Sequence, residues 1–188
     1  MKRLAALLAA LFTTACAPSD PPLTPLIVAI RAADINAARS LLEGGAHPDK
    51  PGGINRWPPL LHAVHKRQSA AVRLLLDHRA NPNAAPASGY TALMMAAAYG
   101  DAETVRLLLS RGANPRLRTR SGQTALHFAV GGNLDLDHFT LTDCQTETVR
   151  LLTAADPELR LGPSFLDQVP AWLARAGGCR EVIRLAQR

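Results

Sequence analysis

One pattern of two short helical segments recurs five times along this chain, and the recurrence limits the possible folds more than any other feature. Aligning the copies on their second helix brings five apolar residues to equivalent positions: Ala38, Val72, Val105, Val149 and Ile183. Successive members are 34, 33, 44 and 34 residues apart. A period of about 33 residues with two helices per unit is typical of a stacked solenoid, in which neighbouring units bury one another's apolar faces. We therefore expect an all-α solenoid with an extended surface for a partner and no deep pocket for catalysis.

The third copy shows the residues that begin and end each helix. Thr91 precedes the first helix and Asp101 the second, where their side-chain oxygens can accept from the first turn of each helix. Gly112 is placed to end the second helix in a left-handed turn. The opening motif of this copy, Thr-Ala-Leu, has counterparts at residues 24–26, 58–60, 124–127 and, in weaker form, 169–172.

These motifs resemble the ankyrin repeat, whose units open with Thr-Pro-Leu-His and continue with Glu-Val-Val and a pair of leucines. The resemblance extends from about residue 24 to residue 188. It implies about five stacked units with extended fingers between them, at residues 24–57, 58–90, 91–123, 124–168 and, as a terminal cap, 169–188. His127 occupies the motif's own histidine position, which implies a structural hydrogen bond rather than catalysis. The concave side, formed by first helices and fingers, is where the resemblance places a partner protein.

One unit departs from the pattern where its second helix ends. Arg79 stands where the third unit has Gly112. A left-handed conformation is costly for a residue with a Cβ atom, so we expect this turn to be strained or differently shaped.

The N-terminus reads as an export signal. Lys2 and Arg3 precede a short apolar run at residues 4–12, too short to cross a bilayer, and small residues follow it. Cys16 comes directly after Thr-Thr-Ala, which resembles a bacterial lipoprotein signal, although Thr13 replaces the usual leucine. This predicts a signal peptide at 1–15, acylation of Cys16 and a short proline-rich tether at 16–23. The expected location is the periplasmic face of a bacterial membrane, as an outer-membrane lipoprotein; the alternative is an ordinary signal peptide with Cys16 incidental.

Charge and composition argue against a nucleic-acid role. The formal net charge is +6, but aromatic residues make up only 4% of the chain. A nucleic-acid surface needs a concentrated basic face with aromatic side chains for stacking, and the sequence shows neither. We expect a monomer with no cofactor and no metal, whose partners are another protein and, through the lipid, the membrane.

The two remaining cysteines, Cys144 and Cys179, precede the second helices of the fourth and fifth units. In an oxidising compartment an even pair suggests a disulfide bond, which would join the last two units. Equivalent positions on stacked helices are about 8–10 Å apart, farther than a disulfide allows. Two small buried thiols are the alternative.

An insertion at residues 134–144 separates the two helices of the fourth unit. It carries Asp135, Asp137 and Phe139, which we predict as partner-binding residues because loops inserted into solenoids are often binding elements. A metal site that adds His138 and Asp143 is a less favoured alternative, since no known ligand spacing is matched. A solvated acidic loop is the ordinary interpretation.

The finger between the third and fourth units carries three alternating arginines: Arg116, Arg118 and Arg120. Alternation in an extended segment places side chains on one side, so these residues could hold an acidic surface or could be merely solvated. Trp57, directly before the second unit, is either a packing residue or a partner-binding one. His62 and His65 share a helix face, but no third ligand accompanies them.

The sequence therefore favours a non-catalytic protein–protein interaction module, anchored in the envelope as an adaptor or stabiliser. The alternative function is a periplasmic inhibitor or immunity protein that neutralises an exported toxin. An enzyme with its site at the insertion is the least favoured reading.

Overall fold

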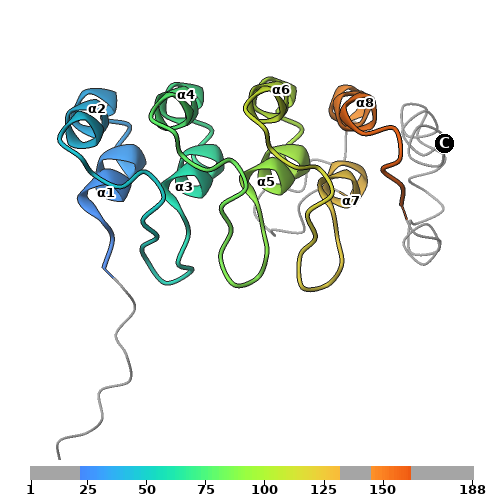
Figure 1. The fold of residues 1–188 in the computed structure, drawn as a ribbon, viewed down its shortest axis with the longest axis horizontal. Helices are drawn as coiled ribbons and strands as arrows, with labels where there is room; N and C mark the ends of the chain where they lie inside the picture. Colours follow the sequence, from blue (N-terminus) through green and yellow to red (C-terminus); the bar gives the residue numbers. More distant parts are fainter. Residues whose placement is uncertain (1–21, 132–144, 162–188) are drawn as a thin grey trace, which may run out of the picture.

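The computed structural model describes residues 22–131 and 145–161, and within these ranges the chain forms four stacked helix pairs (Figure 1). The helices are α1 (Pro25–Arg31), α2 (Ile35–Glu43), α3 (Pro59–His65), α4 (Ser69–Asp77), α5 (Ala92–Ala98), α6 (Ala102–Ser110), α7 (Ala125–Gly131) and α8 (Thr146–Ala155). The first helices of the pairs make one layer, the second helices make the other, and the connecting loops project as fingers (Figure 1). The prediction of an all-α solenoid is confirmed for these residues. The predicted terminal unit and the insertion are outside them.

The predicted register of the repeat is confirmed by burial. Four of the five aligned positions are described, and none is more than 1% exposed: Ala38, Val72, Val105 and Val149. Ile183 is outside the described residues. The same apolar position of each second helix therefore faces the interior, as one shared core requires.

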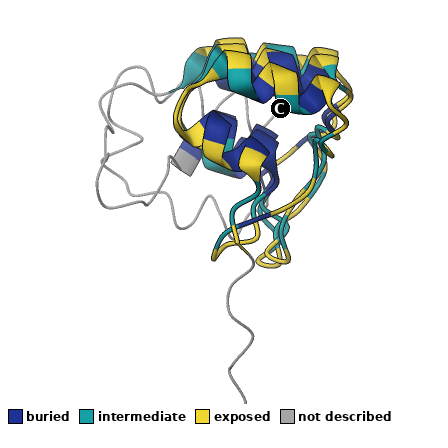
Figure 2. Ribbon diagram, turned by 90° about the vertical axis from the view of Figure 1, so that its left-hand side faces the viewer, coloured by how far each residue is buried: buried dark blue, intermediate teal, exposed yellow. Residues whose placement is uncertain are grey.

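The interior lies between the two helix layers, and exposed residues cover the outer surfaces (Figure 2). Alanines line the first helices where these pack side by side: Ala29, Ala63, Ala96 and Ala129 are at most 7% exposed. Small side chains at these positions allow neighbouring helices to approach closely. Every residue of the central helix α5 is buried.

The predicted helix caps are present. Thr91 Oγ1 accepts from Met94 N at 3.2 Å, and Asp101 Oδ1 accepts from Thr104 N at 3.0 Å. Thr24 and Asp34 cap α1 and α2 in the same way. Each cap supplies an acceptor to a backbone donor that the helix itself leaves unpaired.

Arg79 adopts the left-handed turn that its glycine counterparts adopt. Its φ is 63°, against 90° for Gly45 and 85° for Gly112. Ala80 N donates to Leu75 O at 2.9 Å, so this bond spans Arg79 and connects the residue after it back to the last turn of α4. We expected this turn to be either strained or differently shaped. It keeps the shape of the glycine turns, so Arg79 has the strained left-handed backbone. The surrounding repeat imposes this conformation on a residue type that disfavours it.

Ion pairs connect the second helices along the outside of the stack. Arg73 pairs with Glu103 at 2.6 Å, and the equivalent Arg106 pairs with Glu147 at 3.0 Å. These side chains are 52–62% exposed, so each pair contributes little to stability. The pairs do neutralise charge on this outer face.

Candidate functional site

A repeated four-residue segment, Ala-x-Pro-x, forms the base of each finger. The backbone N–H of its fourth residue donates to the side chain of its second residue, which forms a tight local turn. The four pairs are Asp49 N with His47 Nδ1 at 3.1 Å, Asn83 N with Asn81 Oδ1 at 2.9 Å, Arg116 N with Asn114 Oδ1 at 2.9 Å, and Glu158 N with Asp156 Oδ1 at 3.1 Å.

Hydrogen bonds also join each finger base to the next. Asp49 Oδ1 accepts from Asn81 N at 2.9 Å. In the following junction, Asn83 Oδ1 accepts from Asn114 N at 2.7 Å, and Asn83 Nδ2 donates to Gly112 O at 3.1 Å. The fingers are therefore held at fixed spacing by side chain to backbone bonds, so their shape exists before a partner arrives.

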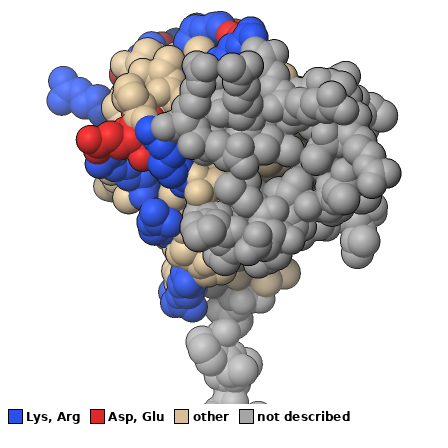
Figure 3. Space-filling view, turned by 90° about the vertical axis from the view of Figure 1, so that its right-hand side faces the viewer, with Lys and Arg blue, Asp and Glu red and all other residues tan. Residues whose placement is uncertain are grey.

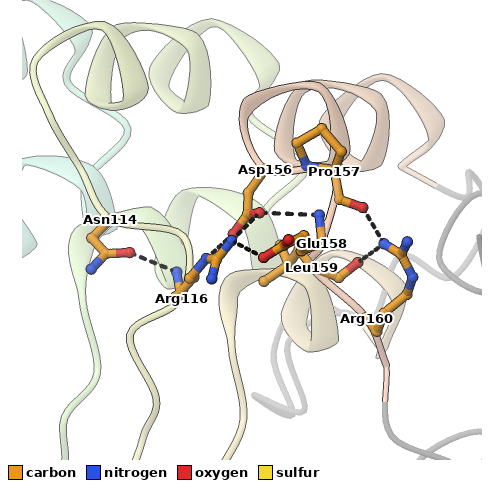
Figure 4. Close-up of polar contacts among 7 residues, drawn as sticks. All are labelled: Asn114, Arg116, Asp156, Pro157, Glu158, Leu159 and Arg160. Atoms are coloured by element: carbon orange, nitrogen blue, oxygen red, sulfur yellow. Dashed lines mark hydrogen bonds and ion pairs between the residues drawn. The ribbon is translucent and has the colours of Figure 1, made fainter.

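The third junction uses the opposite polarity because Arg116 has donors and no acceptor. Its Nη2 donates to Asp156 Oδ1 and to Glu158 Oε2, each at 2.8 Å, and its Nε donates to Asp156 Oδ2 (Figure 4). The Asp156 side chain is only 7% exposed. The hydrogen bonds from Arg116 lower the pKa of the Asp156 carboxyl, and burial opposes this shift in part. Arg116 is thus engaged within the molecule, although a role for it in partner binding stays a prediction.

Exposure alternates along the segment that carries the three arginines. Their side chains are exposed, whereas Leu117 and Thr119 between them are half-buried. Arg118 Nη1 donates to Gly122 O at 2.7 Å within the same finger. Arg120 N donates to Ser88 O at 3.0 Å, which joins the tips of two fingers through their backbones.

The same two finger tips approach closely at Gly89. Its φ is 78°, and a Cβ atom placed there would be 2.8 Å from Arg118 O. Gly122 has the equivalent place on the next finger and a φ of 81°, but nothing is within 4 Å of a Cβ at that position. The two glycines share a backbone conformation and differ in their surroundings.

Substitution of these two glycines by alanine should separate backbone strain from finger contact. Gly122→Ala is expected to lower the free energy of unfolding by roughly 1 kcal/mol, the cost of a left-handed alanine. Gly89→Ala should cost about 1–3 kcal/mol more, because its Cβ displaces the backbone of the neighbouring finger. Urea unfolding followed by circular dichroism gives both values. Equal losses would mean that the two fingers move apart freely, contrary to the contact described here.

Aromatic and imidazole rings form a row across the first helices. Trp57 is half-buried, with ring centroids 5.6 Å from His62 and 5.4 Å from His65. His65 Nδ1 lies 2.8 Å from Tyr99 Oη, and the Arg67 guanidinium lies 5.0 Å from the Tyr99 ring centroid. Trp57 therefore contacts α3 and also borders the open surface beside it.

His62 Nε2 is buried and has no hydrogen-bond partner within the described part of the chain. Burial lowers the pKa of this imidazole below its ordinary 6.5, the Gly52 backbone opposes the shift, and the positive charges of Arg31, His65 and Lys66 add to it. His127, as predicted, has a structural bond: its Nδ1 accepts from Thr124 N at 3.1 Å. Burial, then the charge of Arg118, lowers its pKa as well.

Acidification is expected to destabilise the fold through these imidazoles. A lowered folded-state pKa means that the unfolded chain takes up the proton first, so stability is complete above pH 6.5 and declines as the pH falls below it. His62→Met places there the residue that the third unit has at the equivalent position, Met95, and should reduce this decline. Urea unfolding at a series of pH values measures it. An unchanged pH profile in the variant would remove His62 from the explanation.

An open groove of about 750 Å³ lies among the finger tips. It is formed by residues 54–57 of the first finger, 86–88 and Tyr90 of the second, 119–121 and Gln123 of the third, and Phe128 of α7. We call it the finger groove. Tyr90 and Phe128 meet edge to face with centroids 5.0 Å apart. Ile54, which also lines the groove, is 78% exposed.

The finger groove brings together some of the predicted site residues and adds others. Trp57 and Arg120 line it. Arg116 borders a separate hollow with Asp156 and Glu158. Arg118 lines neither hollow and donates to Gly122 O within its own finger. The other predicted residues are outside the described ones, so the lipid, disulfide and insertion predictions stay predictions: Cys16, Asp135, Asp137, Phe139, Cys144 and Cys179.

Sequence reasoning missed Ile54, Arg56, Tyr90 and Phe128. Trp57 and Tyr90 share one position, directly before the opening motif of a unit, and Phe128 shares another with His62 and Met95. Listing the residue types at such variable positions would have indicated the aromatic ones.

Two other kinds of feature are absent from residues 22–131 and 145–161. No group of three or more His, Cys, Asp or Glu side chains there is arranged to hold a metal ion. None of the helices described is both long and apolar enough to cross a membrane.

Comparison with known proteins gives matches along most of the chain. Models of ankyrin repeats match residues 4–86 (three copies) and 75–129 (many copies). A solved ankyrin repeat domain from Acinetobacter baumannii AYE is 30% identical with a TM-score of 0.71, and the match covers 96% of this chain and 88% of that one. The ankyrin repeat domain of Bcl-3, described as a unique member of the IkappaB family, is 37% identical with a TM-score of 0.55, covering 56% and 46% respectively.

Among curated proteins, the human 2-5A-dependent ribonuclease is 35% identical over 78 residues, or 42% of this chain. The chain spans 10% of the length of that relative.

Proposed function

This chain belongs to the ankyrin-repeat family, whose repeats generally mediate protein–protein interaction, and from that premise we propose that its finger groove binds a partner protein. The module is non-catalytic, as domains of this family typically are.

The observation that supports this proposal is an apolar surface presented on a preformed support. Ile54, Trp57 and the Tyr90–Phe128 pair offer apolar area along the finger groove. Bonds from finger base to finger base, and from Arg120 N to Ser88 O, fix the groove before binding. A preformed surface loses little conformational entropy when it binds, so a few well-placed side chains suffice for affinity.

We further propose that the module is held in a bacterial envelope by acylation at Cys16. The apolar run at 4–12 and the Thr-Thr-Ala-Cys sequence support this, and the tether at 16–23 would keep the solenoid close to the bilayer. In that location it would serve as an adaptor or stabiliser, or as an inhibitor of an exported toxin.

Affinity capture from envelope extracts tests the binding proposal. The full chain, Ile54→Ser and Trp57→Ala serve as baits, and Arg39→Gln is the control because Arg39 is exposed on α2, in the layer away from the fingers (Figure 1). We expect one protein to be enriched by the full chain and by the control, and to be lost from both groove variants. Circular dichroism must show that the baits are folded. Equal recovery by all four baits would move the binding surface elsewhere; identification of a toxin would select the inhibitor.

Fractionation and mass spectrometry test the anchor separately. The mature N-terminus should be an acylated Cys16 in the membrane fraction, and Cys16→Ser should release the protein. An intact residue 1–15 segment on the protein in the cytosol would contradict the envelope proposal.

A further inference from the structure

Resting on the proposed function, we infer the chemistry of the partner: the finger groove takes an acidic segment of a protein that carries one large apolar side chain between its carboxylates. The apolar side chain of the partner would lie against Ile54, Trp57, Tyr90 and Phe128. Arg56 and Arg120 would pair with the flanking carboxylates.

The charge of the finger tips supports this assignment. Residues 50–57, 84–90 and 117–123 contain Lys50, Arg56, Arg118 and Arg120, and no Asp or Glu. The two charged residues that line the groove are Arg56 and Arg120. Neither forms an ion pair with any residue of the described ranges. Free guanidinium groups beside an apolar strip attract carboxylates and disfavour a basic partner.

Within residues 22–131 and 145–161, no Asp or Glu lines the groove, and most of the acidic side chains there are engaged elsewhere. Glu103 and Glu147 pair with arginines of the second helices, and Asp77 pairs with Arg111 directly after α6. Asp156 and Glu158 pair with Arg116 at the third junction. Asp49 accepts from the backbone of the next finger. Viewed from the α8 end, the charged side chains visible along the lower left of the molecule are Lys and Arg (Figure 3). The chain thus neutralises its outer face and leaves its finger tips positive.

The backbone holds both groove arginines in place. Arg120 N is bonded to Ser88 O, so its Cα is fixed relative to the second finger. Arg56 N donates to Gly53 O at 2.9 Å, and Arg56 has a left-handed φ of 49° in the tight tip of the first finger. The apolar rings and the two arginines lie in the same groove. A ligand that carries both carboxylates and an apolar side chain can therefore contact more of the groove than a purely acidic or a purely apolar ligand.

Fluorescence anisotropy with short labelled peptides tests the inference on the full mature chain. One peptide carries glutamates around a central Phe, a second replaces the glutamates by lysines, and a third replaces the Phe by Ser. The critical variant is Arg56→Glu with Arg120→Glu. Its matched control is Arg39→Glu with Arg79→Glu, which changes the net charge equally at two exposed arginines outside the groove.

We expect the acidic Phe peptide to bind, and to bind less tightly as salt is added. The groove reversal should weaken it by about tenfold or more and should make the lysine peptide the better ligand. The control pair should change affinity far less, and loss of the Phe should weaken binding to every form.

Three results would overturn the inference: no binding of the acidic peptide, equal effects of the two charge reversals, or sedimentation showing that the groove holds a second copy of the chain. If Ile54→Ser abolishes capture of the partner but reversal of the two groove charges does not, the groove binds a partner and that partner is not recognised through carboxylates. If neither Ile54→Ser nor the charge reversal lowers capture, the finger groove is not the binding surface.

Discussion

Leu93→Ala is expected to lower the free energy of unfolding by about 2–5 kcal/mol, the largest stability loss we expect from a single substitution here. Leu93 is 1% exposed, in the wholly buried helix α5 between α3 and α7. Removing its side chain leaves a cavity that rigid helix pairs on both sides cannot fill. Because each unit of a solenoid is stabilised only by its neighbours, the defect weakens two interfaces together.

Urea unfolding followed by circular dichroism measures this loss, and the repeat itself provides replicates. Leu60 and Leu126 occupy the same position in the flanking units and are fully buried. Alanine at either should cost a similar amount. Val28→Ala is the control, since Val28 is 51% exposed, and it should change stability by less than about 0.5 kcal/mol. A loss at Leu93 as small as the loss at Val28 would contradict the single shared core.

Asp156→Ala is expected to be the most damaging substitution of any charged residue described. It leaves Arg116 without the carboxylate that accepts from its Nε and Nη2, and it removes the acceptor for Glu158 N. The Arg116 side chain is 59% exposed and keeps Glu158, so the expected loss comes from the three hydrogen bonds that the buried Asp156 side chain accepts. The thermal midpoint should fall, and backbone amides of α8 should exchange with solvent before those of α4.

Glu158→Ala is the matched control. Glu158 accepts from the same guanidinium at 2.8 Å, but its side chain is 79% exposed. Its removal should have little effect. The pH profile adds a second check: the Asp156 pKa is lowered from 3.8, so its contribution is complete above that pH and is lost as the pH falls through the lower folded-state value. If the two alanine variants unfold alike, burial of Asp156 is not what stabilises this junction.

The fold was predictable from the sequence because the same capping, turn and apolar residues recur at equivalent positions in successive units. Thr91, Asp101 and Gly112 each perform locally what their residue type favours, and the structure confirms all three. The identity of the buried face followed from Val105 and its equivalents, since a helix must turn its apolar stripe inward. Arg79 shows the limit of local reasoning, because its neighbours impose a conformation that the residue alone disfavours.

The candidate site was less accessible to sequence reasoning because it depends on variable positions of different units. Trp57 and Arg120 were predicted as binding residues, but they are separated by two units along the chain and only the stacking brings them to one groove. Arg116 looked equivalent to Arg118 and Arg120 in the alternating run. Its role differs because Asp156, 40 residues later, comes within reach. Neither relation is visible as a spacing between neighbouring residues.

The reversed polarity at the third junction has a consequence for how this chain could be lengthened or shortened by recombination. The first two junctions each pair an Asp or Asn acceptor with a backbone donor that every unit possesses, so a duplicated second unit would join its own copy. A duplicated third unit would present the Arg116 guanidinium where its copy has Asn114 rather than a carboxylate. A unit inserted between the third and fourth units would separate Arg116 from Asp156, whereas insertion between the first two units would preserve their type of junction.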